Sequence, residues 1–206
     1  NAHSIVSGEM PELKVRSKDF FFMPESLPQR ASDTLVSLVS QRLPAKYDFS
    51  PKWDIQVLCP SKLGELGTHN LNVCLQKVLN PPAPLKPEHN FAGITFRQGD
   101  KVMQIKNNYD MMWIRDSGEN GLGVYNGDIG IIIGVDKFSS TLRIRFDDRE
   151  VDYPFDLLSE LEHAYAITVH KSQGSEYPVV IIPMYSCAPM LLTRNLLYTA
   201  VTRAKK

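Results

Sequence analysis

The sequence carries no excess of either charge. Its 206 residues include 23 Lys or Arg and 23 Asp or Glu, so the formal net charge is zero. A neutral chain has no long-range electrostatic attraction to nucleic acid or to an anionic membrane surface. The sequence also lacks an apolar run of the roughly 20 residues that a membrane helix needs, and its first residues do not form a signal peptide. Composition therefore indicates no partner, and recognition has to come from local groups.

Cysteine is scarce in this chain. Cys59, Cys74 and Cys187 are odd in number, widely spaced and set among apolar residues. No pair of them has the spacing of zinc ligands, so we expect no metal site from cysteine. The pattern favours reduced core thiols, as in a cytoplasmic protein.

A phosphate-binding loop is also missing. The sequence contains no G-x-x-x-x-G-K-[ST], the loop that cradles a triphosphate. The acidic segment "DDRE", Asp147–Glu150, follows the alternating run "TLRIRF" rather than a buried apolar strand, so it predicts a hairpin turn rather than a magnesium-binding carboxylate. The chain starts at Asn1 without Met and ends at Lys206 inside a predicted helix. We therefore expect a fragment of a larger protein.

Proline and glycine are distributed unevenly, which predicts an inserted module. Ten of the 14 prolines lie in the first 87 residues, and eight of the 12 glycines lie between Gly93 and Gly134. Such a shift in composition is typical of a domain boundary. We expect residues 1–88 and 159–206 to form one domain, and residues 89–158 to form an insert within it.

Strand and helix patterns alternate in the two outer parts. The run "IQVLC" predicts a buried strand over Ile55–Cys59, and "FFF" predicts a short buried strand over Phe20–Phe22. After residue 160, "AYAITV" and "VVIIP" are near-continuous apolar runs, typical of a parallel sheet. These patterns predict an α/β layer architecture.

Helices are predicted from apolar residues at helical spacing. One begins at a cap at Ser32 or Asp33 and continues through Leu43. A second covers residues 71–79, with Leu71, Cys74, Leu75, Val78 and Leu79 on its apolar face. A third covers "MLLTRNLLYTAVTRAKK" at the end of the chain.

In the middle part of the sequence, residues 89–158, apolar and polar residues alternate with a period of two. In "TLRIRF", Leu142, Ile144 and Phe146 point one way, and two arginines point the other. Several short strands at this spacing predict a small β-barrel. Residues 89–158 hold 8 basic and 11 acidic residues, a net charge of −3 that argues against a broad phosphate-binding surface here.

The segment "HKSQGSE", residues 170–176, concentrates polar groups directly after a predicted strand. Ligands of open α/β sheets bind at the carboxyl ends of the strands. His170, Lys171 and Ser172 can donate to phosphate oxygens, and Glu176 can accept from a sugar hydroxyl. An ordinary solvated loop is the alternative interpretation.

Arg203 in "YTAVTRAKK" also allows two interpretations. It is either a surface arginine that extends from a helix, or an arginine directed at a phosphate group. The planar guanidinium suits bidentate phosphate contact, and such an arginine can stabilise charge during phosphoryl transfer.

Together these segments resemble the RecD-like superfamily 1 DNA helicases, of the exodeoxyribonuclease V alpha chain type. "AYAITVHKSQGSEYPVVIIP" is similar to motif V of that family, and "LLYTAVTRAKK" is similar to motif VI. "QVLCPSKLGELGTHNLNVCLQKVLNP" resembles the region around motif IV. The resemblance covers nearly the whole chain. It implies a RecA-like second motor domain, a parallel sheet with flanking helices, with an inserted SH3-like β-barrel.

The resemblance also implies residue roles. Three residues would face the backbone of single-stranded DNA: Thr168, His170 and Ser172. Three would line the path to the nucleotide: Gln173, Gly174 and Glu176. Arg203 would be the catalytic arginine finger that reaches the γ-phosphate of ATP, and Lys62 would approach the nucleotide after the motif IV strand.

The implied activity is ATP-driven translocation on single-stranded DNA, from 5′ to 3′, in DNA repair or recombination. ATP and Mg²⁺ would be held mostly by a preceding motor domain of the same protein, so we expect this chain alone to hydrolyse no ATP. Two alternatives stay open. The chain could belong to a relaxase–helicase fusion, or it could be a non-catalytic scaffold whose barrel docks a protein partner.

Overall fold

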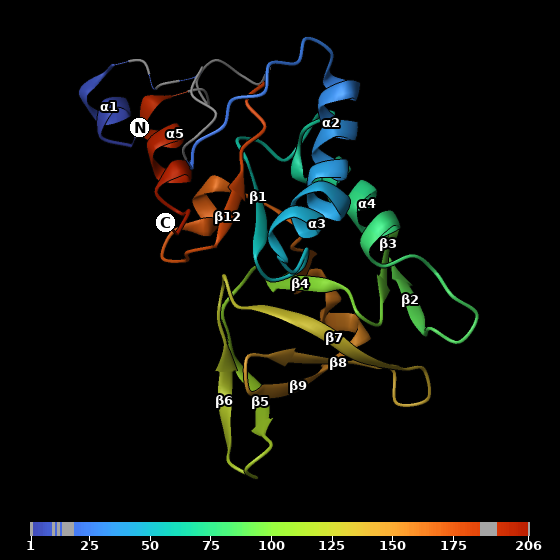
Figure 1. The fold of residues 1–206 in the computed structure, drawn as a ribbon. Helices are drawn as coiled ribbons and strands as arrows, with labels where there is room; N and C mark the ends of the chain where they lie inside the picture. Colours follow the sequence, from blue (N-terminus) through green and yellow to red (C-terminus); the bar gives the residue numbers. More distant parts are fainter. Residues whose placement is uncertain (1, 10, 12, 14–18, 186–192, 206) are drawn as a thin grey trace. The chain divides into compact units, whose positions relative to one another are not determined.

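The computed structural model describes residues 2–9, 11, 13, 19–185 and 193–205 (Figure 1). The chain forms two compact units. Asn1–Leu79 and Ala166–Lys206 make up the first, which we call the host unit, and Asn80–Tyr165 make up the second, which we call the insert. The barrel predicted over residues 89–158 lies within this insert. In the described part of the chain, no helix is long and apolar enough to cross a membrane.

A three-stranded parallel sheet forms the centre of the host unit. Its order is β11 (Ala166–Thr168), β1 (Ile55–Cys59) and β12 (Val179–Ile181). Val57 of the central strand lies opposite Ala166 on one side and Ile181 on the other. All five residues of β1 are buried, as its continuous apolar sequence predicts. The predicted parallel α/β sheet is therefore confirmed.

Helices cover both faces of this sheet. Figure 1 shows α2, α3 and α4 on one side, and α1 and α5 on the other. In the described part of the chain, these helices have the following bounds: α1 Ala2–Ser7, α2 Pro28–Ser37, α3 Leu43–Tyr47, α4 Thr68–Leu79 and α5 Arg194–Val201. α1 packs against α5, and α4 packs against β11. The layered arrangement leaves the carboxyl ends of the strands free to carry loops.

Two predicted helix boundaries are wrong. The helix expected to begin at Ser32 or Asp33 begins at Pro28, because proline suits the first turn, where its missing N–H would be unpaired anyway. This helix continues through a π-helical turn, η1 (Leu38–Arg42), into α3. The wider turn precedes Pro44, which cannot donate to an ordinary helical hydrogen bond. α5 begins at Arg194, while Leu191 and Leu192 of its predicted apolar face lie outside the described residues.

The buried face of α4 also differs from the prediction. Leu71 and Leu75 are fully buried, but Val78 is 47% exposed. The helix is turned because Asn72 faces inward, where it exchanges two hydrogen bonds with the backbone of Ala166. The predicted strand at Phe20–Phe22 is not formed either. Phe21 and Phe22 are about half exposed, and the segment has no strand partner in the described chain.

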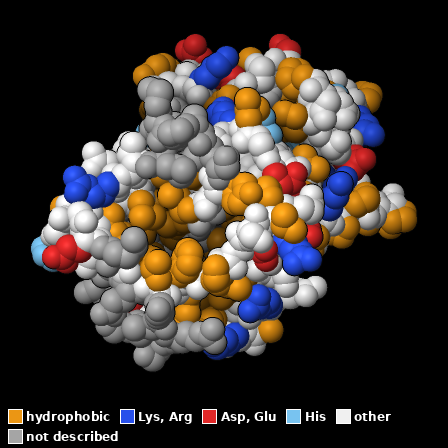
Figure 2. All heavy atoms as spheres, turned by 90° about the horizontal axis from the view of Figure 1, so that it is seen from above, with side chains coloured by type: hydrophobic (Ala, Val, Ile, Leu, Met, Phe, Trp, Pro, Cys, Tyr) orange, Lys and Arg blue, Asp and Glu red, His pale blue; other side chains and the backbone are white. Residues whose placement is uncertain are grey.

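Apolar surface remains exposed on the host unit. Phe21, Phe22 and Leu63 are each more than half exposed. Figure 2 shows apolar side chains gathered around a hollow on the face seen from above. Exposed apolar surface of this kind is typical of a chain that packs against another protein surface.

The insert is an antiparallel β unit. Its main sheet has the order β10-β4-β7-β8-β9-β5-β6, and β2 and β3 form a separate hairpin. The strand bounds are β2 Glu88–Phe91, β3 Ile94–Arg97, β4 Lys101–Gln104, β5 Asn108–Arg115, β6 Asn120–Val124, β7 Ile129–Asp136, β8 Thr141–Phe146, β9 Arg149–Pro154 and β10 Leu161–His163. A 3-10 turn, η2 (Phe155–Glu160), joins β9 to β10. The sheet bends, so β5 and β6 cross the direction of β8 and β9 (Figure 1).

The core of the insert follows the predicted alternation. Leu142, Ile144 and Phe146 are almost completely buried in one cluster, while Arg143 and Arg145 are exposed. β8 and β9 are joined by a tight turn in which Asp147 has a φ of 51°. The "DDRE" segment therefore contains the predicted hairpin turn, at Asp147 and Asp148, while Arg149 and Glu150 begin β9.

Candidate functional site

The candidate site is built on the chain that leaves β11. The strand ends at Thr168 and passes directly into a 3-10 turn, η3 (Val169–Ser172). Backbone hydrogen bonds continue the turn, from the Gln173 N–H to the His170 carbonyl and from the Ser175 N–H to the Ser172 carbonyl. Gly174 has a φ of 86°, a left-handed conformation that glycine adopts without strain. The polar groups of residues 170–176, which we call the 170–176 turn, thus project from the carboxyl end of a parallel strand.

Two of the three residues predicted to face DNA are accessible. His170 is exposed, and Thr168 is partly exposed. Ser172 is fully buried, and its hydroxyl donates to the Val169 carbonyl at 2.7 Å. This hydroxyl closes the 3-10 turn from inside. The expected contact between Ser172 and DNA is therefore incompatible with this conformation, and we assign the side chain a structural role.

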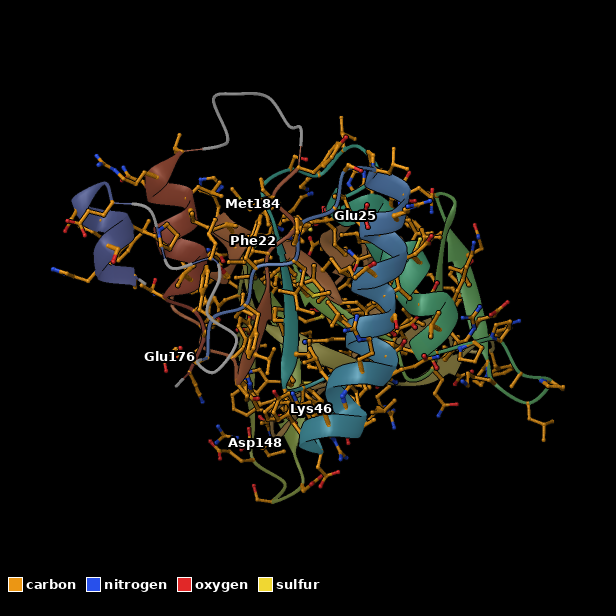
Figure 3. All side chains as sticks on the ribbon, turned by 45° about the horizontal axis from the view of Figure 1, so that its top comes forward. Phe22, Glu25, Lys46, Asp148, Glu176 and Met184 are labelled. Carbon is orange, nitrogen blue, oxygen red and sulfur yellow. The ribbon has the colours of Figure 1, made fainter. Side chains whose placement is uncertain are left out.

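The three residues predicted to face the nucleotide are all exposed. They are Gln173, Gly174 and Glu176. Figure 3 shows Glu176 at the edge of the host unit. Lys62 is exposed as well, in the loop after β1, and its carbonyl accepts from the His69 N–H at 3.1 Å. These side chains are open to solvent and to ligands.

A cleft of about 290 Å³ lies between the 170–176 turn and α5. The turn side contributes Val169, His170 and Gln173. The helix side is lined by Thr193, Asn195, Leu196 and Thr199. Most of these side chains carry hydrogen-bonding groups, so the cleft suits a polar or anionic ligand.

Thr193 also fixes the start of α5. Its hydroxyl oxygen accepts a hydrogen bond from the Leu196 N–H at 3.2 Å, which caps the first turn. The helix side of the cleft is not predicted from the sequence, because the predicted helix begins before Thr193. A threonine directly before an apolar helical pattern is the signal that would have located this cap.

Arg203 lies against the same turn. Its guanidinium donates from Nη1 to the Ser175 carbonyl and from Nε to the Thr199 carbonyl, each at 3.3 Å. Among the described residues it has no carboxylate partner within 4.0 Å, so its charge is not neutralised by an ion pair. A phosphate group could replace the two carbonyl acceptors, because a guanidinium binds phosphate oxygens more strongly than neutral carbonyls.

The backbone joins Arg203 to the turn as well. The Tyr177 N–H donates to the Arg203 carbonyl at 2.8 Å, and the Lys205 N–H donates to the Tyr177 carbonyl at 2.7 Å. Tyr177 and Ala204 form a parallel bridge. Three hydrogen bonds thus connect Arg203 and Lys205, after α5, to Ser175 and Tyr177, so a shift of one segment is expected to displace the other.

The described residues offer no metal site and no disulfide. No group of three or more His, Cys, Asp or Glu side chains in that part of the chain could hold a metal ion. Cys59 and Cys74 are free thiols, and burial raises the pKa of Cys59 to about 12. Cys187 lies outside the described residues. The two described cysteines therefore agree with the expectation of reduced thiols.

Two family models match the chain. Residues 71–146 match the SH3 domain of the ATP-dependent RecD-like DNA helicases. Residues 163–206 match the UvrD-like helicase C-terminal domain. The first match covers most of the insert, and the second covers the 170–176 turn and α5.

Curated relatives include two helicase proteins. The chain is 34% identical over 151 residues to the ATP-dependent RecD2 DNA helicase of Deinococcus radiodurans, covering 73% of this chain and 19% of the relative. It is 41% identical over 90 residues to the RecBCD enzyme subunit RecD of Mycobacterium tuberculosis, covering 42% of this chain and 15% of the relative. It is also 34% identical over 176 residues to the uncharacterized protein MJ1519 of Methanocaldococcus jannaschii, covering 78% of this chain and 15% of the relative. The chain spans less than a fifth of the length of these relatives.

Among solved structures, Bacteroides Pif1 bound to ssDNA has a TM-score of 0.46 and 18% sequence identity, covering 84% of this chain and 42% of that chain. The family models, together with the parallel sheet, confirm the predicted fold class, a RecA-like second motor domain with an inserted SH3-like β-barrel. The chain belongs to the RecD-like superfamily 1 helicases and contains their C-terminal helicase domain.

Proposed function

We propose that this chain is the second motor domain of an enzyme that couples ATP hydrolysis to translocation on single-stranded DNA. One observation carries the proposal. Arg203 donates to the Ser175 carbonyl in the same turn that exposes His170 and Gln173 to the cleft. A group that can bind phosphate and a surface that can bind DNA are therefore parts of one connected structure.

In this proposal, single-stranded DNA binds in the cleft between the 170–176 turn and α5. His170 and Asn195 line it from opposite sides, and both side chains can donate to a phosphodiester oxygen. Thr168 precedes the turn and is partly exposed, so it belongs to the same surface. Ser172 is omitted from the proposed contacts because its hydroxyl is buried.

The nucleotide side consists of Arg203 with Gln173, Gly174 and Glu176. When bound, ATP with Mg²⁺ supplies the transferable phosphoryl group, and a preceding motor domain of the longer protein would hold most of it. Arg203 would stabilise the negative charge on the γ-phosphate, which is the role of an arginine finger. To do so, its guanidinium has to leave the Ser175 and Thr199 carbonyls.

This exchange of partners would couple the two sides. While Arg203 binds the Ser175 carbonyl, the turn is held by the guanidinium. Once Arg203 binds phosphate, that hydrogen bond is lost, and the turn is free to change its contact with DNA. The backbone bridge at Tyr177 keeps the two segments together during this movement.

Several finer properties of the proposed enzyme follow from the family resemblance. They are 5′ to 3′ movement, a role in DNA repair or recombination, and a cytoplasmic location. A relaxase–helicase fusion of related motif type remains the alternative. The presence or absence of a relaxase domain in the longer protein decides between them. On the same basis, the 206-residue chain alone is expected to hydrolyse no ATP.

A second candidate function concerns the insert, which we propose as a docking module for a protein partner. The β5–β6 hairpin and the residue that follows it expose five large apolar side chains, each between 44% and 63% exposed: Tyr109, Met112, Ile114, Leu122 and Tyr125. The arginines of the adjacent strands are already paired, Arg143 with Asp152 and Arg145 with Glu150. An apolar surface whose neighbouring arginines are already paired favours a protein over DNA.

DNA binding by the 206-residue chain tests both assignments. We expect His170→Ala to weaken binding of a fluorescent oligo-dT by about tenfold at low salt, because one hydrogen bond to a charged phosphate is removed. Fluorescence anisotropy measures the affinity.

The matched comparison is Leu122→Ser on the hairpin, which is expected to leave DNA affinity unchanged. Equal affinity of the wild-type and His170→Ala chains would refute the proposed cleft contact. A clear loss in Leu122→Ser would place the hairpin in the DNA site and remove the docking proposal.

A further inference from the structure

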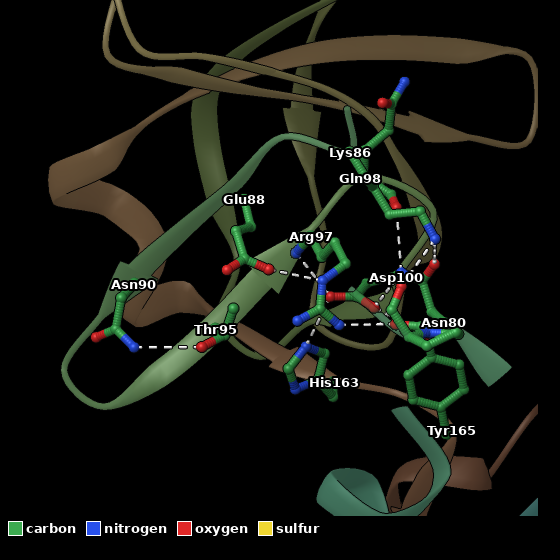
Figure 4. Close-up of polar contacts among 11 residues, drawn as sticks. Asn80, Lys86, Glu88, Asn90, Thr95, Arg97, Gln98, Asp100, His163 and Tyr165 are labelled. Carbon is green, nitrogen blue, oxygen red and sulfur yellow. Dashed lines mark hydrogen bonds and ion pairs between the residues drawn. The ribbon is translucent and has the colours of Figure 1, made fainter. Parts of the chain in front are cut away.

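Asp100 is a fully buried carboxylate in the turn between β3 and β4 of the insert (Figure 4). Its Oδ1 accepts from the Asn80 Nδ2 at 2.6 Å and from the Tyr165 hydroxyl at 3.0 Å. Its Oδ2 accepts from the Arg97 N–H at 2.7 Å and lies 3.2 Å from the His163 Nε2. Each oxygen therefore has at least two partners, which satisfies the hydrogen-bonding needs of a buried carboxylate.

These contacts keep Asp100 ionised. Burial alone would raise its pKa, but the hydrogen bond and charge of His163 and the bonds from Asn80 and Arg97 outweigh burial, and the pKa lies below its usual range. A buried charge without such partners would be strongly destabilising. The network therefore holds together only when all of its members are in place.

The partners of Asp100 include both ends of the insert. Asn80 is the first residue of this unit, and Tyr165 is the last. Further hydrogen bonds reinforce the junction, from the Arg97 Nη1 to the Asn80 carbonyl at 2.7 Å and from the Ala164 N–H to the Lys101 carbonyl at 2.9 Å. One side chain, far from either end in sequence, thus fastens the two ends to each other.

A second polar contact holds the next residue within the host unit. Asn72 of α4 donates from Nδ2 to the Ala166 carbonyl at 2.9 Å, and its Oδ1 accepts from the Ala166 N–H at 2.8 Å. Tyr165 and Ala166 are consecutive in the chain. The chain is therefore held on both sides of the point where it leaves the insert, and the 170–176 turn follows only a few residues later.

We propose that Asp100 and Asn72 form a two-part clamp that fixes the chain where it passes from the insert into β11, so that the insert stabilises the 170–176 turn. The clamp gives the insert a role that its own surface does not reveal. It makes the order of a turn in the host unit depend on a carboxylate in the insert. This inference does not depend on the proposed enzymatic activity.

Hydrogen exchange of backbone amides, measured by NMR on the 206-residue chain, tests the clamp. Asp100→Asn removes the negative charge and replaces one acceptor oxygen by an NH2 group, which then faces the donors that Asp100 accepts from. We expect the amides of Ala164, Ala166 and Gln173 to exchange about 10- to 100-fold faster, as fits the loss of hydrogen bonds to a charged group. The amide of Ile144, in the distant part of the sheet, should be unchanged.

Asp152→Asn is the matched control, because it removes the same charge from an exposed position in the same unit. It should change none of these rates by more than about twofold. If Asp100→Asn does not fold, Tyr165→Phe, which removes one donor and keeps the ring, replaces it and should give the same pattern with a smaller change. Two results would overturn the proposal. One is faster amide exchange throughout the insert, and the other is faster exchange at Ala164 with unchanged exchange at Ala166 and Gln173.

Discussion

Buried polar side chains at single positions determine much of this structure. Asn72 turns α4 toward β11, and Ser172 closes the 3-10 turn from inside. Neither role could be predicted from the sequence, because Asn72 lies at a position that apolar spacing assigns to the solvent side, and Ser172 has the same chemistry as a ligand-binding hydroxyl. The Asn72 bond joins residues 94 positions apart, and the Ser172 bond is local but forms only because the 3-10 turn buries the hydroxyl, so residue types alone encode neither.

Lys101 gives a prediction at the same scale. It is only 2% exposed, and burial lowers its pKa from 10.5 to about 8. Between pH 8 and 10.5 the unfolded chain then binds more protons than the folded chain, so stability rises with pH, by up to about 1.4 kcal/mol per pH unit. Burial raises the pKa of Tyr153 and Tyr165, so above pH 10 the folded chain keeps protons that the unfolded chain loses, and stability falls.

Urea unfolding followed by the fluorescence of Trp113 reports on the insert once Trp53 is replaced by Phe. We expect the midpoint to rise from pH 8 to about 10 and to fall above it, as the two kinds of pKa shift require. Lys101→Met should abolish the rise. A flat profile in the parent chain, or the same rise in Lys101→Met, would show that the lysine is not the cause.

At the scale of elements, the predictable parts are those with a strong apolar pattern. β1, β8 and the parallel strands after residue 160 lie where continuous or alternating runs predict them. Phe20–Phe22 has an equally apolar sequence but no neighbouring strand to pair with in the described chain. A strand requires a partner as well as a pattern, and the partner is a tertiary feature. Apolar spacing does not predict the helix starts at Pro28 and Arg194, because a proline in the first turn sets one and the Thr193 cap sets the other.

Two glycines of β7 provide a matched prediction. A methyl group added at Gly130 would lie 2.6 Å from the Arg145 carbonyl oxygen, and the backbone of β8 cannot move away without breaking the ladder. A methyl group at Gly134 would meet nothing closer than 3.7 Å, which is ordinary contact. We expect Gly130→Ala to destabilise the insert by about 1–3 kcal/mol, and Gly134→Ala to change its stability by less than about 0.5 kcal/mol.

The same Trp113 unfolding assay measures both variants. Equal stability of the two would mean that β7 and β8 are less closely packed at Gly130 than the structure shows. A larger loss in Gly134→Ala would contradict the prediction outright.

At the scale of the whole molecule, the uneven distribution of proline and glycine predicted an insert. The two-residue alternation of apolar and polar side chains predicted its β architecture. The order of the motifs, rather than any single one, identified the family, because "HKSQGSE" alone is also compatible with a solvated loop. The helix side of the cleft and the contact between Arg203 and Ser175 could not be predicted, since they depend on how α5 packs against the turn. The sequence therefore indicated which residues matter and left their present contacts open.

The central claim is that Arg203 acts on ATP while the neighbouring turn acts on DNA. In the full-length helicase that contains this chain, ATP turnover stimulated by single-stranded DNA should fall by about 10³-fold or more in Arg203→Ala, since an arginine finger contributes at least this much. DNA affinity should stay within about threefold, and Arg143→Ala on the insert should leave both unchanged. Normal ATP turnover in Arg203→Ala, with the protein folded and bound to DNA, would contradict the account.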